Sequence, residues 1–166
     1  MKLSSESYIY ANYKNFDKLL IIRFPNVVGG NMTHGLLYDL IKKLKKNNKK
    51  INILGNGSQK KPYLHVSNLV SYMYSLYKKN LNSKISVFNI GPSDNGITVK
   101  EIVNKFIKVL KVKNIDVIYQ KKIEGWKGDV VKYSYNTNLI KKTLNINVPS
   151  SKKCINQAIK DISIEL

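Results

Sequence analysis

The chain has 166 residues, of which 43% are apolar and 23% charged, a balance typical of one folded domain with its own core. It holds no apolar run long enough to span a membrane, no secretory signal and a single cysteine, Cys154. We therefore expect a cytoplasmic protein with Cys154 buried and no disulfide. The formal net charge of +19 raises the expectation of a nucleic-acid partner, but Arg23 is the only arginine. Since nucleic-acid readers rely on the planar guanidinium, we interpret the lysines as a solvated surface.

Apolar periodicity predicts helices and strands that alternate along the chain, which is typical of an α/β fold. A short helix is expected over 3–14, and the continuous apolar run at 19–24 predicts a strand buried on both faces. A glycine-containing loop that starts at Val27 then leads into an amphipathic helix at 34–46. A further short strand is expected at 51–54.

The second half of the chain continues the alternation. An extended stretch at 63–66 precedes a helix that is capped by Ser67 or Asn68 and ends near residue 79. The apolar residues of this helix are Leu69, Val70, Met73, Leu76 and Tyr77. The remaining expected elements are a strand at 86–90, a helix opened by a capping box of Thr98 and Glu101, a strand at 115–119, and helices at 136–143 and 151–164, the last with Ile155, Ala158, Ile159 and Ile162 inward.

The residues that could carry chemistry on their own are few. His34 and His65 are the only histidines, and neither has a serine or cysteine partner at the spacing of a known nucleophile motif. Two histidines without a carboxylate cluster make a metal site unexpected. Because no glycine-rich phosphate-binding motif is present, the chain is expected to have no nucleotide cofactor site of its own. We expect His65 to hold the turn before the following helix.

Five segments occur in an order that resembles the extended short-chain dehydrogenase family, and most closely its UDP-glucose 4-epimerase branch. They lie at 23–29, 54–66, 88–91, 98–102 and 125–130. The resemblance covers essentially the whole chain. It implies the C-terminal portion of that α/β fold, with the last Rossmann strand and a small substrate-binding domain, and with the N-terminal Rossmann part absent. Residues 1–32 would be a remnant of the Rossmann domain, and residues 33–166 a nucleotide-sugar-binding region.

The resemblance also implies roles for matching positions. Asn26 matches an asparagine that hydrogen-bonds the nucleotide-sugar near its diphosphate, although a turn-forming asparagine is an alternative. Lys61 matches an arginine of the nucleotide-binding stretch, and it keeps the charge but lacks the bidentate fork. The other implied substrate-binding residues are His34 and Gly35 near the diphosphate, Asn52, Ile53 and Leu54 that contact uracil through backbone groups, and Lys127, Asp129 and Tyr133 that close over the nucleotide.

Two positions are implied for cofactor and catalysis. Lys2 matches the lysine of the family's Y-x-x-x-K motif, whose tyrosine would lie four residues earlier. The resemblance implies that Lys2 is the catalytic and cofactor-binding residue. The alternative is a disordered terminal lysine. Pro25 matches the position beside the nicotinamide of NAD. In the family mechanism the tyrosine is the general base while NAD takes the hydride.

The sequence therefore predicts the substrate-binding part of an NAD-dependent epimerase or dehydratase, inactive alone, with epimerisation at C4 of a UDP-sugar as the first choice. Three alternatives stay open: a non-catalytic UDP-sugar-binding fragment, a chain completed by a separately encoded Rossmann half through the strand at 19–24, and a basic nucleic-acid-binding protein. The implied partners are a UDP-sugar and, for the complete enzyme, NAD and a second copy in a homodimer. Neither a metal nor a membrane is expected.

Overall fold

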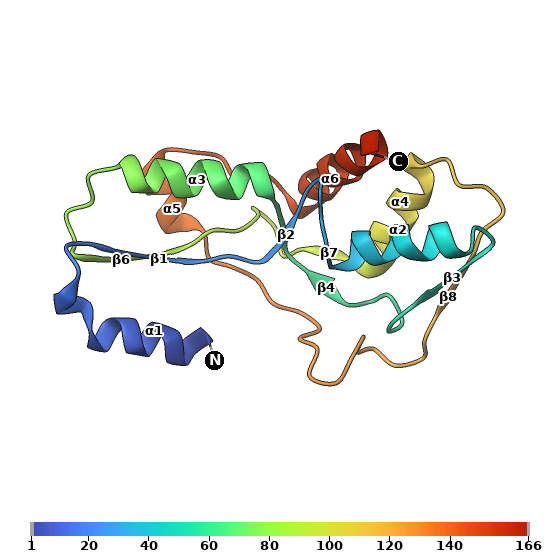
Figure 1. Ribbon diagram of the computed structural model, residues 1–166, viewed down its shortest axis with the longest axis horizontal. Helices are drawn as coiled ribbons and strands as arrows, with labels where there is room; N and C mark the ends of the chain where they lie inside the picture. The colour runs from blue at the N-terminus through green and yellow to red at the C-terminus, as the bar shows by residue number, and fades with distance from the viewer. Residues whose placement is uncertain (1, 166) are drawn as a thin grey trace.

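The protein is elongated, with two groups of elements side by side along its long axis (Figure 1). The computed structural model describes residues 2–165, so Met1 and Leu166 lie outside it. The β1–β6 half contains α1 (Lys2–Ala11), β1 (Leu19–Arg23), α3 (Val66–Lys78), β6 (Ile85–Asn89) and α5 (Asn138–Leu144). The β3–β8 half contains α2 (Leu36–Lys46), β3 (Lys50–Ile53), β4 (Lys60–Lys61), β7 (Ile97–Thr98), α4 (Val99–Val109), β8 (Asp116–Tyr119) and α6 (Ser151–Glu165). β2 (Asn26–Val28) and β5 (Tyr63–His65) lie between the halves, and a short 3-10 turn, η1 (Tyr13–Asn15), follows α1.

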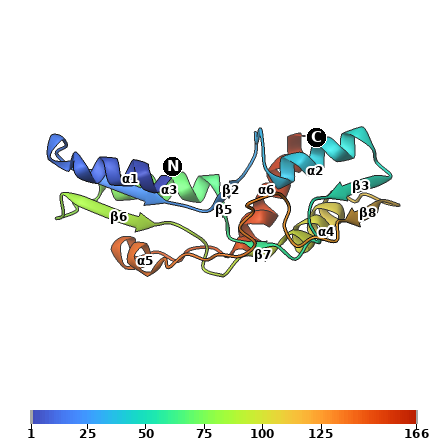
Figure 2. The ribbon, with the colours of Figure 1, turned by 90° about the horizontal axis from the view of Figure 1, so that it is seen from below.

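Each strand pair joins segments that are far apart in the sequence. Three pairs are parallel: β1 with β6, β2 with β5, and β3 with β8, whereas β4 and β7 are antiparallel. Parallel pairing requires a long crossover, and helices supply it here. Figure 2 shows α1 and α3 on one side of β6 and α5 on the other. This arrangement confirms the predicted α/β class.

Strand β1 differs from its prediction in its surroundings. Leu19 to Ile22 are only half-buried, and Arg23 is exposed, so the prediction of burial on both faces is wrong for the described chain. Within residues 2–165 its single partner strand is β6. The neighbouring α1 buries none of its own residues and is tied to β1 by an ion pair in which Arg23 Nε donates to Glu6 Oε1 at 2.9 Å. The apolar run shows how much apolar surface the strand carries, but burial depends on what covers it.

The hydrophobic core is concentrated in the β3–β8 half. The predicted inward face of α6 is confirmed, since all four residues are buried. The predicted capping box of α4 is also present: Thr98 Oγ1 accepts from the Glu101 backbone N–H at 3.2 Å, and Glu101 accepts from the Thr98 N–H at 2.9 Å. Cys154 is buried in this core as a free thiol, as expected. Core side chains of this half with almost no exposed surface are Leu37, Leu40, Ile51, Ile102, Val103, Phe106, Ile155, Ala158 and Ile159.

Helix α3 is apolar over a wider arc than the sheet covers. Of its apolar residues Leu69 and Leu76 are buried, whereas Val70, Met73 and Tyr77 are exposed. None of the described helices combines the length and the apolarity needed to cross a membrane.

Three short strands were not predicted: β2, β4 and β7. Each has two or three residues, too few for the alternation of a half-buried strand to show. The loop predicted to begin at Val27 is instead strand up to Val28, paired with β5. Two of these strands carry predicted substrate-binding residues, since β2 contains Asn26 and β4 contains Lys61.

Candidate functional site

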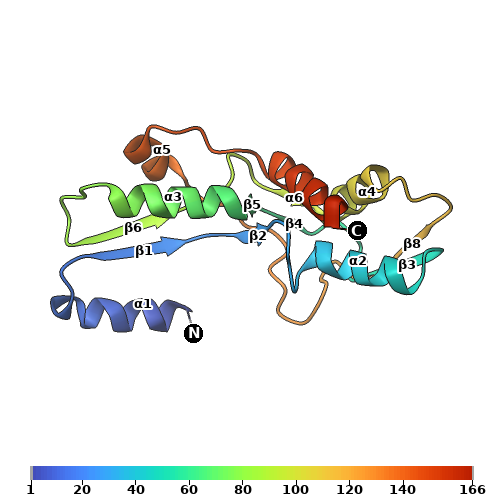
Figure 3. The ribbon, with the colours of Figure 1, turned by 45° about the horizontal axis from the view of Figure 1, so that its top comes forward.

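A cavity of about 720 Å³ lies where β2 and β5 meet the β3–β8 half. It is lined by the loop between β2 and α2, the first turn of α2, the end of β3, and residues around 125–129. The segment between β8 and α5, which contributes those last residues, crosses from one half to the other (Figure 3). A smaller cavity of about 380 Å³ shares Asn26, Lys61, Trp126 and Asp129 with the first. The larger volume is in the range of small-molecule sites.

The structure brings most of the predicted site residues together. Those that line the larger cavity are Pro25, Asn26, His34, Gly35, Ile53, Leu54, Lys61 and Asp129. Tyr133 lines the smaller one.

Three predicted residues line neither cavity: Lys2, Asn52 and Lys127. Lys2 is exposed on α1, and Lys127 is exposed on the segment that follows β8. Asn52 is also exposed, and its backbone carbonyl already accepts a hydrogen bond from Lys43 Nζ at 2.8 Å. Of the backbone groups expected to meet uracil, those of Ile53 and Leu54 are the ones beside the cavity.

A buried ion pair between Lys61 and Asp129 joins β4 to the segment after β8. The Asp129 side chain is almost fully buried, and its second oxygen accepts from the Gly125 backbone N–H at 3.1 Å. The Lys61 ammonium lies 4.4 Å from the centroid of the Trp126 ring, a distance that allows a cation–π interaction. Lys61 is therefore held between a carboxylate and an aromatic face, and it lines both cavities.

Gly96, directly before β7, lies against the backbone of Lys61. Its φ is +97°, a conformation that favours glycine, and a Cβ there would lie 2.3 Å from the Lys61 carbonyl oxygen. Only a residue without a side chain lets β7 approach β4 this closely.

Asn26 and Tyr133 form a second polar group in the site. Asn26 Nδ2 donates to the Tyr133 hydroxyl at 3.3 Å, and the rings of Tyr133 and Tyr135 meet edge to face with centroids 5.9 Å apart. Burial raises the pKa of Tyr133, and the neighbouring Tyr135 adds to that effect. Tyr133 is therefore a neutral hydrogen-bonding group rather than a base at neutral pH.

The N-terminus of α2 borders the larger cavity. Gly35 is its N-cap, with φ of +94°, and Leu36, Leu37 and Asp39 of the first turns also line the cavity. Unpaired backbone N–H groups and the helix dipole make such a terminus favourable for anions. The carboxylate of Asp39 is neutralised by Lys43 at 2.6 Å.

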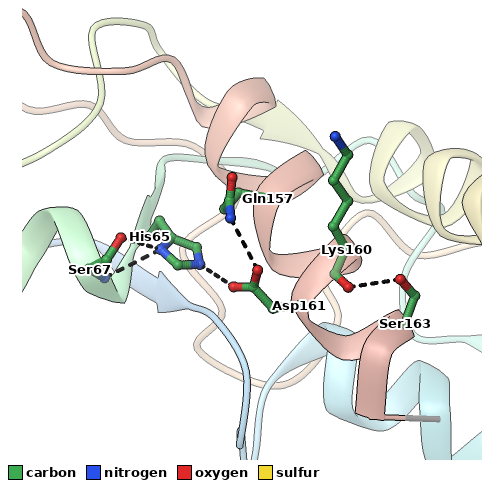
Figure 4. A network of polar contacts seen from close by, with 6 residues as sticks. All are labelled: His65, Ser67, Gln157, Lys160, Asp161 and Ser163. Atoms are coloured by element: carbon green, nitrogen blue, oxygen red, sulfur yellow. Dashed lines mark hydrogen bonds and ion pairs between the residues drawn. The ribbon is translucent and has the colours of Figure 1, made fainter.

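His65 is the centre of a polar network outside the cavities (Figure 4). Its Nδ1 accepts from the Ser67 backbone N–H at 3.3 Å, which makes His65, and not Ser67 or Asn68, the N-cap of α3. On the other side Nε2 lies 2.7 Å from Asp161 on α6. The expected structural role of His65 is confirmed.

The same network contains a serine next to histidine and aspartate. Ser67 Oγ lies 2.7 Å from His65 Nδ1, so a serine does lie beside His65, at a spacing of two residues that matches no known nucleophile motif. Within the described chain, however, none of Ser67, His65 and Asp161 lines either cavity. The network ties α6 to the junction of β5 and α3.

The lining residues that the sequence analysis did not single out include Gln59 and Trp126. Gln59 lines the larger cavity, and Trp126 lines both. Both stand inside the motifs at 54–66 and 125–130, and Trp126 is the single tryptophan of the chain. Their positions inside these motifs could have indicated a role in the site, but the sequence could not show that they line a cavity.

The residues implied for NAD do not form an enclosed site. Pro25 is buried and lines the cavity, whereas Lys2 is exposed and lines neither cavity. These two residues alone do not enclose a dinucleotide.

Comparison with known proteins agrees with this fold. The model of the NAD dependent epimerase/dehydratase family matches residues 1–91. This chain belongs to that family. No curated protein sequence matches it.

Solved structures of similar fold include several sugar-nucleotide epimerases. A UDP-galactose 4-epimerase superposes with a TM-score of 0.84 at 24% identity, covering 99% of this chain and 52% of that one. UDP-glucuronic acid 4-epimerase from Bacillus cereus, in complex with UDP-glucuronic acid and NAD, gives 0.79 at 18% identity with coverage of 99% and 52%. UDP-glucose 4-epimerase from Thermotoga maritima, with UDP-glucose, gives 0.76 at 22% identity with coverage of 99% and 52%. The chain spans about half the length of these proteins and corresponds to part of the extended short-chain dehydrogenase fold.

Proposed function

We propose that this chain forms the nucleotide-sugar-binding part of an NAD-dependent epimerase or dehydratase, with a UDP-sugar bound in the larger cavity. The observation that carries the proposal is the convergence of Asn26, Lys61 and Asp129, from three distant segments, on one cavity. The similar solved structures are named for UDP-sugars, which supports this choice of ligand. Epimerisation at C4 is the reaction we propose for the complete enzyme.

Two features of the cavity suit a diphosphate. Lys61 supplies a cation, and the N-terminus of α2 supplies backbone N–H groups and a positive dipole end. The ion pair of Lys61 with Asp129 means that a phosphate competes with Asp129 for the ammonium group. Once displaced, the Asp129 carboxylate can accept a hydrogen bond from a sugar hydroxyl.

NAD belongs to this proposal only for the complete enzyme, in which it would accept the hydride from the sugar. Lys2 keeps its proposed catalytic role and Pro25 its proposed place beside the nicotinamide, and in the purified chain we expect no NAD binding and no turnover. A cytoplasmic location and a homodimer for the complete enzyme are further parts of the proposal.

Calorimetric titration of the purified chain with UDP-galactose, UDP-glucose and NAD tests the ligand assignment. We expect saturable heat with the UDP-sugars and none with NAD, and Lys61→Met should weaken sugar-nucleotide binding at least tenfold. Lys108, exposed on the outer side of α4, offers a matched control, since Lys108→Met removes the same charge away from both cavities. Absence of UDP-sugar binding, or equal loss in the two variants, would contradict the assignment.

A second candidate function, completion by a separately encoded Rossmann half, is favoured by one observation. The Leu19 backbone N–H donates to the carbonyl oxygen of Lys84, next to β6, at 2.8 Å. Because backbone amides alternate in direction along a strand, those of Leu20 and Ile22 point to the other edge of β1. Within the described chain that edge has no strand partner, and an unpaired edge can add a further strand. Hydrogen exchange tests this: Leu20 and Ile22 should exchange much faster than Leu19 and Ile21 in the purified chain. Equal protection would show that the edge is already covered.

A further inference from the structure

Gln59 is a buried polar residue whose hydrogen bonding is incomplete. It is 2% exposed and lines the larger cavity. Its Nε2 donates to the Leu54 carbonyl oxygen at 3.2 Å, and because a carbonyl can only accept, this contact fixes which end of the carboxamide faces Leu54. The other end, Oε1, is buried and has no hydrogen-bond partner among the described residues.

The surrounding backbone is shaped to hold the Gln59 carboxamide in place. Gly55 has φ of +75°, and a Cβ there would lie 1.7 Å from Gln59 Nε2. A Cβ on Gly125 would come within 3.5 Å of the same atom. The glycine at position 55 thus allows its backbone to close on the Gln59 side chain, whereas the Gly125 distance is an ordinary van der Waals contact.

A buried acceptor without a partner is costly, and native proteins rarely leave one. Gln59 Oε1 belongs to a residue that faces a cavity large enough for a small molecule, so the missing partner can come from a ligand. Lys61 lies two residues further along the same stretch and lines the same cavity. Side chains at this spacing in an extended chain are about 7 Å apart, so a phosphate at Lys61 would bring the nucleoside part of a ligand within reach of Gln59.

We propose that Gln59 Oε1 accepts a hydrogen bond from the nucleoside of the bound ligand and makes the site selective for nucleotides with a donor there. The donor is either the imide N–H of a uracil-type base or a ribose hydroxyl. This inference rests on the proposed function, because it takes a nucleotide as the ligand. A ligand without the donor would leave the buried acceptor unpaired, and sites of this kind discriminate strongly.

The test compares four ligands on the wild-type chain by calorimetry: UDP, CDP, 2′-deoxy-UDP and 3′-deoxy-UDP. CDP lacks the imide N–H, and each deoxy compound lacks one hydroxyl. We expect UDP to bind at least tenfold more tightly than one of the three, and the identity of that ligand names the donor. If UDP binds and all four ligands bind alike, the role of Gln59 is refuted while the proposed function stands. If no nucleotide binds, the proposed function fails and this inference fails with it.

Two variants separate recognition from a structural role. Both Gln59→Met and Gln59→Glu lose the donor to Leu54, but only Gln59→Glu keeps an acceptor oxygen. The preference for UDP should disappear in Gln59→Met and persist in Gln59→Glu, even though its charge weakens all four ligands. Gln120 gives a matched control, since its Oε1 accepts from the Gly55 N–H of the same turn at 3.2 Å but the residue lines neither cavity. Gln120→Met should keep the wild-type preference, and an unchanged preference in Gln59→Met would overturn the proposal.

Discussion

The two halves of the molecule differ in how completely they bury their own apolar side chains. In the β3–β8 half, α4 and α6 place Phe106 and Ile159 out of contact with solvent. In the β1–β6 half, α1 buries no residue, and α3 exposes Tyr74 and Tyr77. Most of the exposed large hydrophobic side chains described belong to residues 3–24, α3 or α5.

The difference shows that ligand binding and partner binding have different structural requirements. The larger cavity needs rigid walls, and α2, β3, β4, α4 and α6 of the well-packed β3–β8 half supply part of its lining. Exposed apolar surface of the kind found on α1 and α3 is typical of surfaces that meet another protein surface. We therefore expect mutations in the two halves to act on different properties.

The largest expected effect is on the core of the β3–β8 half. Phe106 is 0% exposed, and Phe106→Ala should lower the free energy of unfolding by about 3–5 kcal/mol, because it removes apolar contacts and leaves a cavity. Urea denaturation measures the loss. Tyr74, on the exposed face of α3, is 61% exposed, and Tyr74→Ala should change the same free energy by less than about 0.5 kcal/mol. A large effect of Tyr74→Ala would mean that α3 is covered in solution, and the contrast between the halves would be lost.

The next largest effect concerns the ion pair that links β4 to the segment after β8. Lys61→Met should destabilise the protein by about 3 kcal/mol, because the Asp129 carboxylate would stay buried without its cation. Adding Asp129→Asn should recover most of that loss, since the unpaired charge is then gone. Denaturation of both variants at neutral pH gives the comparison. If Lys61→Met costs little, water reaches Asp129 and the site is more open than described.

A smaller effect is expected at the start of α4. Thr98→Ala should cost about 1 kcal/mol through loss of the capping box. Hydrogen bonds from Thr98 lower the pKa of Glu101 from its ordinary value near 4.5. A carboxylate whose pKa is lowered by folding stabilises the folded state above the unfolded pKa, and this contribution is lost as the pH falls through the folded value. The difference between wild type and Thr98→Ala, measured by urea denaturation, should therefore shrink between neutral pH and about pH 3; a constant difference would exclude the Glu101 carboxylate from the cap.

Long periodic elements were predictable from the sequence, and short paired ones were not. Helices α2, α4 and α6 were found because their apolar residues repeat over several turns. Strands β2, β4 and β7 have two or three residues each and exist through pairing with distant segments. Periodicity also identified the apolar residues of α3, but it could not show which of them are covered, and Val70, Met73 and Tyr77 are exposed.

The candidate site shows a similar limit. Motif resemblance located Asn26, Lys61 and Asp129, and the structure brings them to one cavity. It gave no sign of the contact between Lys61 and Trp126, because the two residues meet only after the segment beyond β8 folds across β4. Nor could it reveal the unpaired oxygen of Gln59, which is a consequence of burial and of the single partner at Leu54.

The most direct test of the central claim uses the only tryptophan of the chain. Trp126 lines both cavities and is 61% exposed, so its fluorescence reports on this site alone. Titration with UDP-galactose should change the emission in a saturable way, with the same dissociation constant as the heat of binding. Binding detected by heat without any change in Trp126 emission would place the ligand elsewhere and contradict the assignment of this cavity.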